Sequence, residues 1–372
     1  MKKKLALALA TVMMLGVCAG CGPKDAPAAS GSGSGNISSS QSVASELKAA
    51  VFYYNFADPY ITTVRTAMDK ELKALGIEYQ NFDGQTNQGQ QTDQVNTAIT
   101  DGYNLLIINV VDNAAPDAAQ AMVNSAKEKG IPVILFNREV DNSVIESYEM
   151  SAFVGTDAPE AGHMQGKMVG DYLVENWDAV DLNKDGKISY VMFKGQEGNA
   201  EAEARTQFGV EDANKVLEEN GKPALEFYDS KNTQKYLVDT NGAWSSQAAT
   251  DYMSVIMGEY NEANKNMVEL VIANNDGMAE GAISYLQGAG FNNDASKAIP
   301  VFGVDALASA CEKIDNGQMA GTVKQDGDAM AATIAALVKN IQNGAALMDN
   351  TDQYNVDEGV AKIRVPYALY TK

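Results

Sequence analysis

The chain has 372 residues, with 49 acidic against 28 basic side chains and a formal net charge of −21 at pH 7. So acidic a protein is a poor partner for nucleic acid, because phosphate binding depends on clustered lysine and arginine. The three cysteines offer no disulfide framework, and the length exceeds what one hydrophobic core usually fills, so we expect two lobes.

The first twenty residues have the pattern of an export signal. Three lysines precede an apolar run from Leu5 to Val17, which is too short to span a bilayer as a permanent helix. The segment ends in Cys18-Ala19-Gly20-Cys21, which resembles a bacterial lipobox with Cys18 in place of the usual Leu. We therefore expect a lipoprotein signal at residues 1–20 and an extracytoplasmic, membrane-anchored protein lipidated at Cys21. A plain secretory signal is the alternative.

The stretch that follows the signal, residues 21–45, consists almost wholly of Gly, Ser, Ala, Pro, Asn and Gln. Such a composition has too few apolar side chains to offset the entropy of ordering, so it predicts a flexible tether. The remaining cysteine, Cys311, lies in a helical run of small residues and is interpreted as a packing residue.

From residue 46 onward, short apolar strands alternate with helical stretches. Strands are expected at Ala49–Tyr54, Ile77–Phe82, Leu105–Val110, Val133–Phe136, Ile188–Phe193, Leu225–Tyr228, Leu270–Ala273, Val301–Val304, Gly321–Val323 and Ile363–Tyr367. Helices are expected at Ile61–Leu75, Ala114–Lys129, Glu160–Glu175, Glu203–Asn220, Ser245–Glu259 and Met278–Gln287. This alternation predicts an α/β fold in which parallel sheets carry helices on both faces. Ligands of such folds bind at the carboxyl ends of the strands.

Polar and aromatic side chains gather just after the predicted strands. They include Asp58, Tyr60, Asn137, Arg138, Glu139, the segment 195–205, Asn275, Asp305 and Gln325. A loop residue, Trp244, adds a second flat apolar face to that of Tyr60. This mixture suits a sugar, because sugar hydroxyls both donate and accept hydrogen bonds while the C–H faces stack on aromatic rings.

The sequence lacks the motifs of common hydrolases. Its only histidine, His163, lies in a helical pattern, and neither GxSxG nor HExxH occurs. We therefore expect a binding protein and not an enzyme. A glycosidase built on a carboxylate pair from Asp58, Glu201 or Asp305 is the alternative.

Five segments closely resemble the galactose/glucose-binding proteins among the bacterial periplasmic binding proteins. They are Val154–Asp157, Asp181–Gly186, Ala202–Arg205, Val271–Asp276 and Pro300–Leu307, within a similarity that spans about residues 49–370. The resemblance implies two Rossmann-like lobes of the type I arrangement, joined by three hinge segments near 155–157, 325–327 and 362. It assigns residues 46–155 and 327–362 to the N-terminal lobe, and residues 156–326 and 363–372 to the C-terminal lobe.

The resemblance also implies a sugar site shared by the two lobes. Seven positions match the family in role: Asp58, Tyr60, Asn137, Arg205, Trp244, Asn275 and Asp305. Three depart from it, with Asn199 in place of His, Glu201 in place of Asp and Gln325 in place of Asn. The longer acid and amide move hydrogen-bonding atoms by about 1.5 Å. A galactose- or glucose-like hexose is the leading ligand, and another epimer or a methyl glycoside is the alternative.

Three of these positions also have a purely structural interpretation. Asp58 precedes a helix and could cap it. Trp244 could pack in a core, and Arg205 could form an ion pair with Glu201 one helical turn earlier. The sequence leaves these alternatives open.

Spacing alone marks a calcium loop. Positions one, three, five, seven and nine would supply oxygen from Asp181, Asn183, Asp185, the carbonyl of Lys187, and Ser189. Position twelve is Met192, so the bidentate acid must come from elsewhere, and the family resemblance assigns it to Glu269. We expect a structural Ca²⁺ ion. An Asx-rich turn without metal is the alternative.

Together these features predict a monomeric extracytoplasmic receptor that closes on a monosaccharide and delivers it to an ABC permease. A receptor that signals through a membrane sensor is the alternative, because both partners would read the same closed lobes. A sugar-responsive transcription regulator of the same fold would need a helix-turn-helix and a basic surface, and the sequence offers neither.

Overall fold

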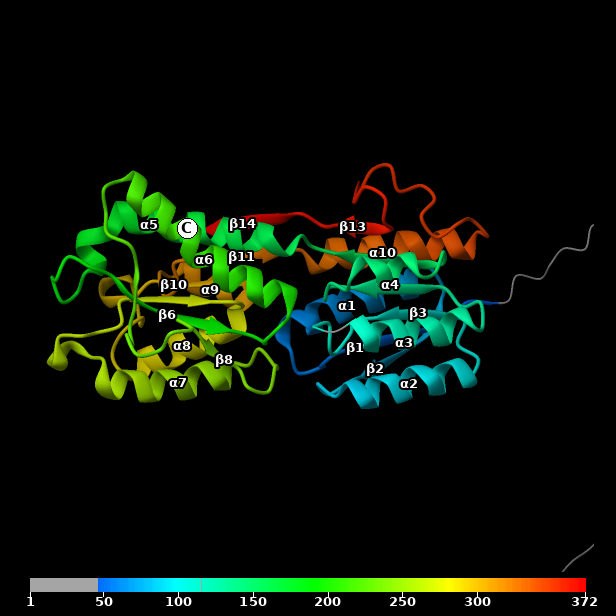
Figure 1. Ribbon diagram of the computed structural model, residues 1–372, viewed down its shortest axis with the longest axis horizontal. Helices are drawn as coiled ribbons and strands as arrows, with labels where there is room; N and C mark the ends of the chain where they lie inside the picture. Colours follow the sequence, from blue (N-terminus) through cyan, green and yellow to red (C-terminus); the bar gives the residue numbers. More distant parts are fainter. Residues whose placement is uncertain (1–45, 115) are drawn as a thin grey trace, which may run out of the picture. The chain divides into compact units, whose positions relative to one another are not determined.

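The computed structural model describes residues 46–372 except residue 115. The predicted signal, tether and lipidation site at Cys21 lie outside the described residues. Within the described part, no helix combines the length and the apolar character needed to cross a membrane. These residues form two α/β lobes within one compact unit (Figure 1).

The first lobe is built on a sheet with the strand order β12-β13-β5-β4-β3-β1-β2. Its neighbours are parallel except β12 and β13. The strands are β1 (Lys48–Tyr53), β2 (Glu78–Asp83), β3 (Leu105–Ile108), β4 (Val133–Phe136), β5 (Ser151–Gly155), β12 (Asn355–Val356) and β13 (Lys362–Arg364). The helices are α1 (Pro59–Ala74), α2 (Gln88–Thr100), α3 (Pro116–Lys127), α4 (Asn142–Glu146) and α10 (Gly327–Gln342).

The second lobe repeats this plan with the strand order β14-β11-β10-β9-β6-β7, and β8 also pairs with β6. The strands are β6 (Ser189–Lys194), β7 (Glu226–Phe227), β8 (Leu237–Val238), β9 (Leu270–Ala273), β10 (Val301–Asp305), β11 (Gly321–Gln325) and β14 (Tyr367–Thr371). The helices are α5 (Ala158–Val180), α6 (Ala200–Glu219), α7 (Ser246–Glu259), α8 (Asp276–Gly288) and α9 (Ala308–Asp315), with 3₁₀ turns η1 (Glu262–Asn264) and η2 (Ala295–Lys297).

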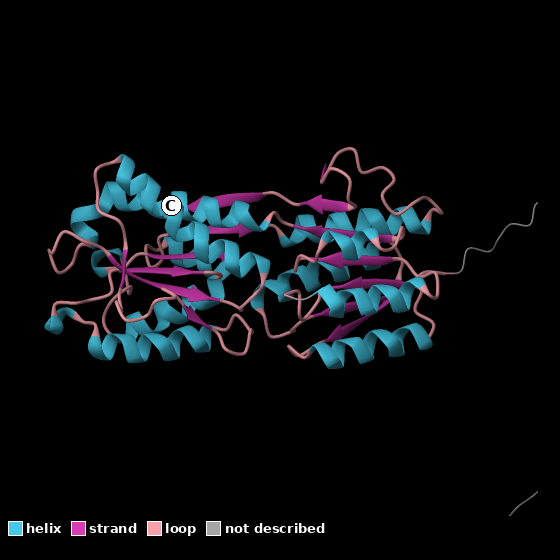
Figure 2. Cartoon of the chain, viewed as in Figure 1, coloured by secondary structure: helices cyan, strands magenta, loops and turns pink. Residues whose placement is uncertain are grey.

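Helices cover both faces of each sheet (Figure 2). In β1, Val51 packs in the cluster that contains residues of α1 and α10, whereas its neighbour Phe52 packs with residues of α2 and α3. Successive side chains of a strand point to opposite faces, so both faces must be apolar. That requirement explains why β3 reads Leu-Leu-Ile-Ile and β4 reads Val-Ile-Leu-Phe, with every residue buried. The α/β prediction with mostly parallel sheets is confirmed.

Glycines on α5 let α6 lie unusually close to it. A Cβ atom on Gly162 would stand 2.5 Å from the carbonyl oxygen of Ala204, and one on Gly166 would stand 2.4 Å from that of Phe208. Both positions exclude any larger side chain, because real Cβ atoms do not approach backbone so closely. This contact fixes α6, which carries Glu201 and Arg205.

Several elements were not predicted from the sequence. The helix α2 is rich in Gln, Asn and Thr and has few apolar positions, so its amphipathic pattern is weak. The short strand β5 was also missed, as was α10. The predicted strand Ile363–Tyr367 is wrong, because β13 ends at Arg364 and β14 begins at Tyr367. Proline has no N–H for a ladder, and Pro366 stands between the two.

The chain passes between the two sheets three times. It leaves the first sheet after β5, returns after β11, and leaves again between β13 and β14. The last passage lies at residues 365–366 and not at about 362, because Lys362, Ile363 and Arg364 pair with β5 of the first sheet. Figure 1 shows it as the red segment that joins β13 to β14.

Candidate functional site

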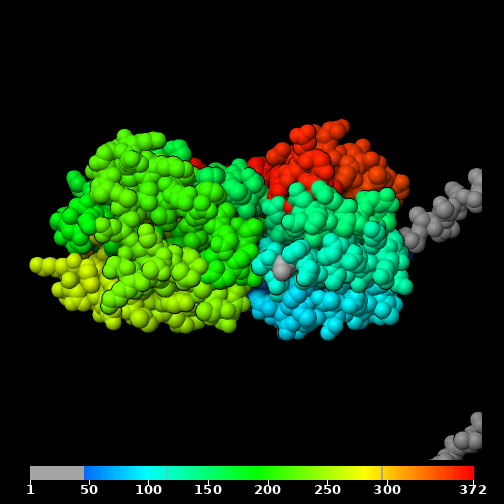
Figure 3. Space-filling model, viewed as in Figure 1, coloured from blue at the N-terminus to red at the C-terminus, as the bar shows by residue number. Residues whose placement is uncertain are grey.

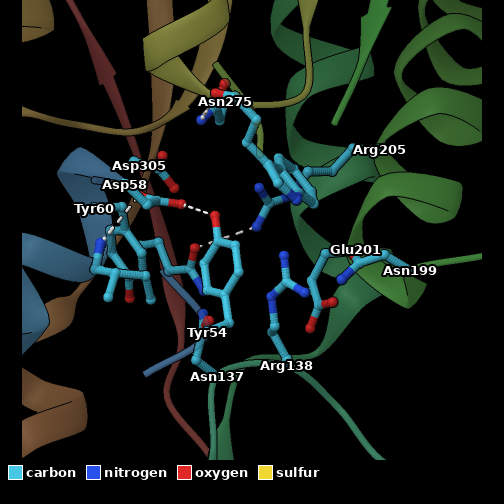
Figure 4. Close-up of a pocket in the computed structure, with 13 residues that line it drawn as sticks. Tyr54, Asp58, Tyr60, Asn137, Arg138, Asn199, Glu201, Arg205, Asn275 and Asp305 are labelled. Carbon is cyan, nitrogen blue, oxygen red and sulfur yellow. Dashed lines mark hydrogen bonds between the residues drawn. The ribbon is translucent and has the colours of Figure 1, made fainter. Parts of the chain in front are cut away.

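A cavity lies where the carboxyl ends of the two sheets meet. Figure 4 shows the thirteen residues that line it. They include all ten residues that the sequence analysis placed in a sugar site: Asp58, Tyr60, Asn137, Asn199, Glu201, Arg205, Trp244, Asn275, Asp305 and Gln325.

Three lining residues were not predicted as site residues: Tyr54, Ile61 and Arg138. Tyr54 follows β1 directly, and Arg138 follows the predicted Asn137 after β4. The guanidinium carbon of Arg138 stands 3.5 Å from the centre of the Tyr54 ring, and its Nη1 donates to the Val111 carbonyl oxygen at 2.6 Å. The position of Arg138 after a strand pointed to the site, but only the fold reveals its contact with Tyr54.

Asp58 both caps α1 and lines the cavity. Its Oδ1 accepts from the Ile61 N–H at 3.1 Å, and the Tyr54 hydroxyl donates to its Oδ2. The capping interpretation and the pocket interpretation are thus both true of this residue. The same double role recurs in the second lobe, where Asn199 Oδ1 accepts from the Ala202 N–H and Asn275 Oδ1 accepts from the Met278 N–H.

Four residues at the site hold a backbone conformation that favours glycine. The φ angles are 63° at Asn137, 56° at Trp244, 126° at Asp305 and 56° at Ala306. Side-chain-bearing residues adopt such angles at a cost that the surrounding structure must offset. Behind Asp305, Asp276 accepts from the Leu307 N–H at 2.8 Å, which holds the loop that follows β10.

Trp244 lies in the loop before α7, with 7% of its surface exposed. Its ring covers Gly195 so closely that a Cβ atom there would stand 2.1 Å from a ring carbon. The residue therefore packs against backbone on one side and lines the cavity as well. A side chain at position 195 would displace the ring from its place.

The ion pair considered between Arg205 and Glu201 is absent among the contacts of the described residues. Arg205 instead donates from Nη1 to the Asn274 carbonyl oxygen at 2.9 Å, and from Nη2 to Gln325 and Tyr367 at 3.2 and 3.0 Å. Arg205 lies four residues after Glu201 on α6, but its guanidinium points to the ends of strands and not back along the helix.

The two lobes touch directly beside the cavity. Asn199 Nδ2 donates to Asn113 Oδ1 at 3.1 Å, and the Glu139 N–H approaches Glu201 Oε1 at 3.4 Å. In the space-filling view the mostly green-to-yellow second lobe meets the first lobe, which is blue to cyan with an orange-to-red part above, along a seam (Figure 3). Both donor–acceptor pairs use a position at which this chain departs from the galactose/glucose-binding pattern.

Five buried polar atoms of the lining residues have no hydrogen-bond partner in the protein. They are the Tyr60 hydroxyl, Arg138 Nη2, Glu201 Oε2, Arg205 Nε and Trp244 Nε1. An unsatisfied buried polar group costs about 1–3 kcal/mol. Together they provide donors and an acceptor that a polyhydroxylated molecule could match.

Burial also governs the charges of the site. It raises the pKa of Asp58 and of Glu201, and it raises the pKa of Asp305 well above its usual range, although the nearby Arg205 guanidinium lowers the pKa of both Glu201 and Asp305. A carboxyl group in a low-dielectric environment favours its neutral, protonated form unless hydrogen-bond donors reach it. Donors from a ligand would therefore shift these acids toward the charged form.

His163 lies outside this pocket. Its Nδ1 is 2.5 Å from Asp212 Oδ2, and its ring stacks on Phe208 with centroids 4.0 Å apart.

The predicted calcium loop lies between α5 and β6. The Asp181 carboxylate accepts from the N–H groups of Asp185 and Gly186, and Asp185 accepts from Lys187 N–H. Glu269 reaches the loop from the residue before β9, as the family resemblance implied. Its two oxygens accept from the N–H groups of Leu182, Asn183 and Ser189.

The donor chemistry of this loop fits a hard cation, because carboxylate, amide and carbonyl oxygens are the ligands of Ca²⁺. Glu269 is 1% exposed, and none of the ion pairs of the described residues involves Asp181, Asp185 or Glu269. In this structure the acids of the loop accept hydrogen bonds from backbone N–H groups, which matches the Asx-rich turn given above as the alternative to a calcium loop. Among residues 46–372, leaving out 115, no three His, Cys, Asp or Glu side chains are grouped closely enough to hold a metal.

Comparison with known proteins places the chain in a family. A family model described as "Periplasmic binding protein domain" matches residues 49–346. The chain is 34% identical to a D-galactose/methyl-galactoside binding periplasmic protein of Haemophilus influenzae over 89% of this chain and 91% of that protein. It is 27% identical to a putative rhizopine-binding protein of Rhizobium meliloti, over 85% and 87% of the two chains.

A solved structure shares the fold. It is an ABC transporter solute-binding protein of Bacillus halodurans with bound myo-inositol, with a TM-score of 0.66, 24% identity, and coverage of 88% of this chain and 95% of that chain. The expectation of a binding protein and not an enzyme is confirmed by the family. The chain belongs to the periplasmic binding proteins, extracytoplasmic substrate-binding proteins with two α/β lobes in the type I arrangement.

Proposed function

We propose that this protein binds a monosaccharide between its lobes and delivers it to the permease of an ABC importer. The observation that carries the proposal is the lining of the cavity, which holds five buried polar atoms without a partner. Tyr60 and Trp244 contribute aromatic surface from opposite lobes. Hydroxyl groups would satisfy the polar atoms, and a sugar ring would rest against the aromatic faces.

A galactose- or glucose-like hexose is the leading ligand. The Haemophilus influenzae relative binds D-galactose and methyl-galactoside, and the Bacillus halodurans protein holds myo-inositol, another ring bearing hydroxyls. Asn199, Glu201 and Gln325 depart from the galactose/glucose-binding pattern, and they are the positions at which we expect this chain to differ in selectivity. A methyl glycoside or a different epimer is the alternative ligand.

Closure would couple binding to delivery. Residues of both lobes line one small cavity, so a ligand gains its full set of contacts only when the lobes meet. The permease would recognise the closed pair of lobes. A membrane sensor could read the same surface, so a signalling role is the alternative, and whether the protein acts as a monomer stays a prediction.

Calorimetry with a panel of hexoses, pentoses, inositols and methyl glycosides tests the ligand class. We expect one or a few pyranoses to bind. Trp244→Ala should weaken that binding by at least about a hundred-fold because it removes a stacking face, whereas Trp244→Phe should retain most of it. Circular dichroism should show both variants folded. Unchanged affinity in folded Trp244→Ala protein would contradict the site.

The pH dependence of affinity follows from the raised pKa values of Asp58, Glu201 and Asp305. Ligand hydroxyls that donate to these acids favour their charged form and lower their pKa on binding, so binding releases protons. Affinity should be full above the pKa values of the ligand-free protein and should fall as the pH decreases through them. Calorimetry from pH 5 to 8 in buffers of different ionisation enthalpy measures this, and affinity that rises on acidification would refute it.

We also propose that Ca²⁺ binds at Asp181, Asn183, Asp185, Glu269 and the Lys187 carbonyl, with Ser189 as a weak or indirect contact. Asp181 and Glu269 are buried acids without a basic partner, which favours a cation, and Ca²⁺ would stabilise the loop between α5 and β6. The ion would compete with the backbone N–H groups that these carboxylates now bind, so its role would be structural.

Chelation tests this proposal. EGTA should lower the melting temperature, and Ca²⁺ at a hundred times its dissociation constant should restore about 2.7 kcal/mol of unfolding free energy, while sugar binding persists. Glu269→Gln should abolish this response. Glu175→Gln, an exposed acid on α5, is the matched control and should keep it. A melting temperature that ignores both EGTA and Ca²⁺ would leave the loop as an Asx turn.

A lipid anchor at Cys21 and a tether over residues 21–45 complete the proposal, and they rest on sequence alone. Such an anchor would hold the receptor near its permease in the membrane. Cell fractionation provides the check. The wild-type protein should be found with membranes, and Cys21→Ser should release it; a wild-type protein found only in the soluble fraction would favour a plain secretory signal.

A further inference from the structure

Four buried polar side chains form a closed ring of hydrogen bonds beside the pocket. Arg205 Nη2 donates to Tyr367 OH at 3.0 Å and to Gln325 Oε1 at 3.2 Å. Thr156 Oγ1 lies 2.8 Å from Tyr367 OH and accepts from Gln325 Nε2 at 3.3 Å. Arg205 and Gln325 line the pocket, whereas Tyr367 and Thr156 do not.

The directions of these bonds are set by the chemistry of the members. An arginine only donates, so the Tyr367 hydroxyl must accept from Arg205, and it can donate its single hydrogen to Thr156 Oγ1. The Gln325 amide uses its oxygen toward Arg205 and its nitrogen toward Thr156. Burial raises the pKa of Tyr367, which keeps this hydroxyl protonated. Every bond of the ring is thus compatible with the others.

The ring brings together one residue from each passage between the lobes. Thr156 directly follows β5 at the first passage, Gln325 ends β11 at the second, and Tyr367 begins β14 after the third. These residues are far apart in sequence but are all buried at one point. Arg205 therefore binds the second passage directly through Gln325 and the third directly through Tyr367. It is linked to the first passage, at Thr156, through either of these residues.

Residues of the first lobe also bind the first passage, at Gly155 and Thr156. Arg364 Nη1 donates to the Thr156 carbonyl oxygen at 2.8 Å, and the Val365 N–H donates to the Gly155 carbonyl oxygen at 2.7 Å. Arg364 also binds both oxygens of Glu139, which follows the pocket residue Arg138 in sequence. Thr156 is thus held through its carbonyl group by the first lobe and through its hydroxyl group by the second.

We infer that Tyr367 is a positioning residue, whose hydroxyl aims Arg205 into the pocket and ties that arginine to the three passages in the closed form. The inference rests on the proposed function for its ligand. The competing interpretation is that Tyr367 only fills space, since its ring packs in the apolar cluster of the second lobe. The two interpretations differ in what loss of the hydroxyl alone would do.

Tyr367→Phe tests them, because it keeps the ring and removes only the hydroxyl. The matched control is Tyr370→Phe on the same strand, whose hydroxyl donates to Asp315 at the surface. We expect Tyr367→Phe to weaken sugar binding about ten-fold, mainly through faster dissociation, the size expected for loss of a hydrogen bond to a charged group. The control should bind as the wild type does.

A second variant keeps the test sharp. Thr156→Val removes the other hydroxyl of the ring at nearly constant volume, and Thr156→Ser should restore wild-type binding. If the ring acts as a unit, the double variant Tyr367→Phe/Thr156→Val should bind only slightly more weakly than either single variant. Effects that multiply independently, or a dissociation rate unchanged in Tyr367→Phe, would overturn the inference.

Small-angle scattering of the ligand-free protein separates this inference from the proposed function. Tyr367→Phe should increase the radius of gyration by favouring open lobes, and Tyr370→Phe should not. An equal radius of gyration in Tyr367→Phe and wild-type protein would overturn the proposed tie between Tyr367 and the three passages, whichever sugar binds. If the wild-type protein binds no member of the sugar panel, the proposed ligand class fails while the scattering comparison still decides the role of Tyr367.

Discussion

Asp58, Asn199 and Asn275 each cap a helix and line the cavity with the same side chain. In parallel sheets with crossover helices, the carboxyl end of a strand and the N-terminus of the next helix meet at one edge. A residue that satisfies the first N–H groups of a helix is therefore already at the place where ligands bind. The two lobes present these edges to each other, and the rest of the site depends on that arrangement.

This arrangement places ionisable side chains in a buried pocket. The pocket gathers three carboxyl groups and two guanidinium groups, and burial raises the pKa of all three acids. Isolated buried charges would be strongly destabilising. Asp58 is supported by a helix N–H and by Tyr54, and Arg205 by Asn274 and Gln325. The atoms that remain without partners are the ones through which a ligand with many hydroxyls would be recognised.

The calcium loop illustrates how one set of residues can serve two interpretations. Asp, Asn and Glu oxygens bind either a hard cation or backbone N–H groups. In this loop they accept from N–H groups, with Glu269 bridging to Leu182 and Ser189. Spacing in the sequence identifies such a loop but says nothing about which partner the oxygens take.

The sequence alone was enough to predict the α/β architecture, the two lobes and the ten lining residues, because strand and helix periodicity and the residues after each strand are local properties, and because the family resemblance supplied their roles. Local patterns did not reveal α2, whose polar composition hides its buried face, or the break at Pro366 between strands of different lobes. Only the tertiary structure brought Arg138 onto Tyr54, turned Arg205 away from Glu201, and joined Thr156, Gln325 and Tyr367 in one ring. Those contacts join residues up to 211 positions apart, and no periodicity within a segment encodes a partner at that distance.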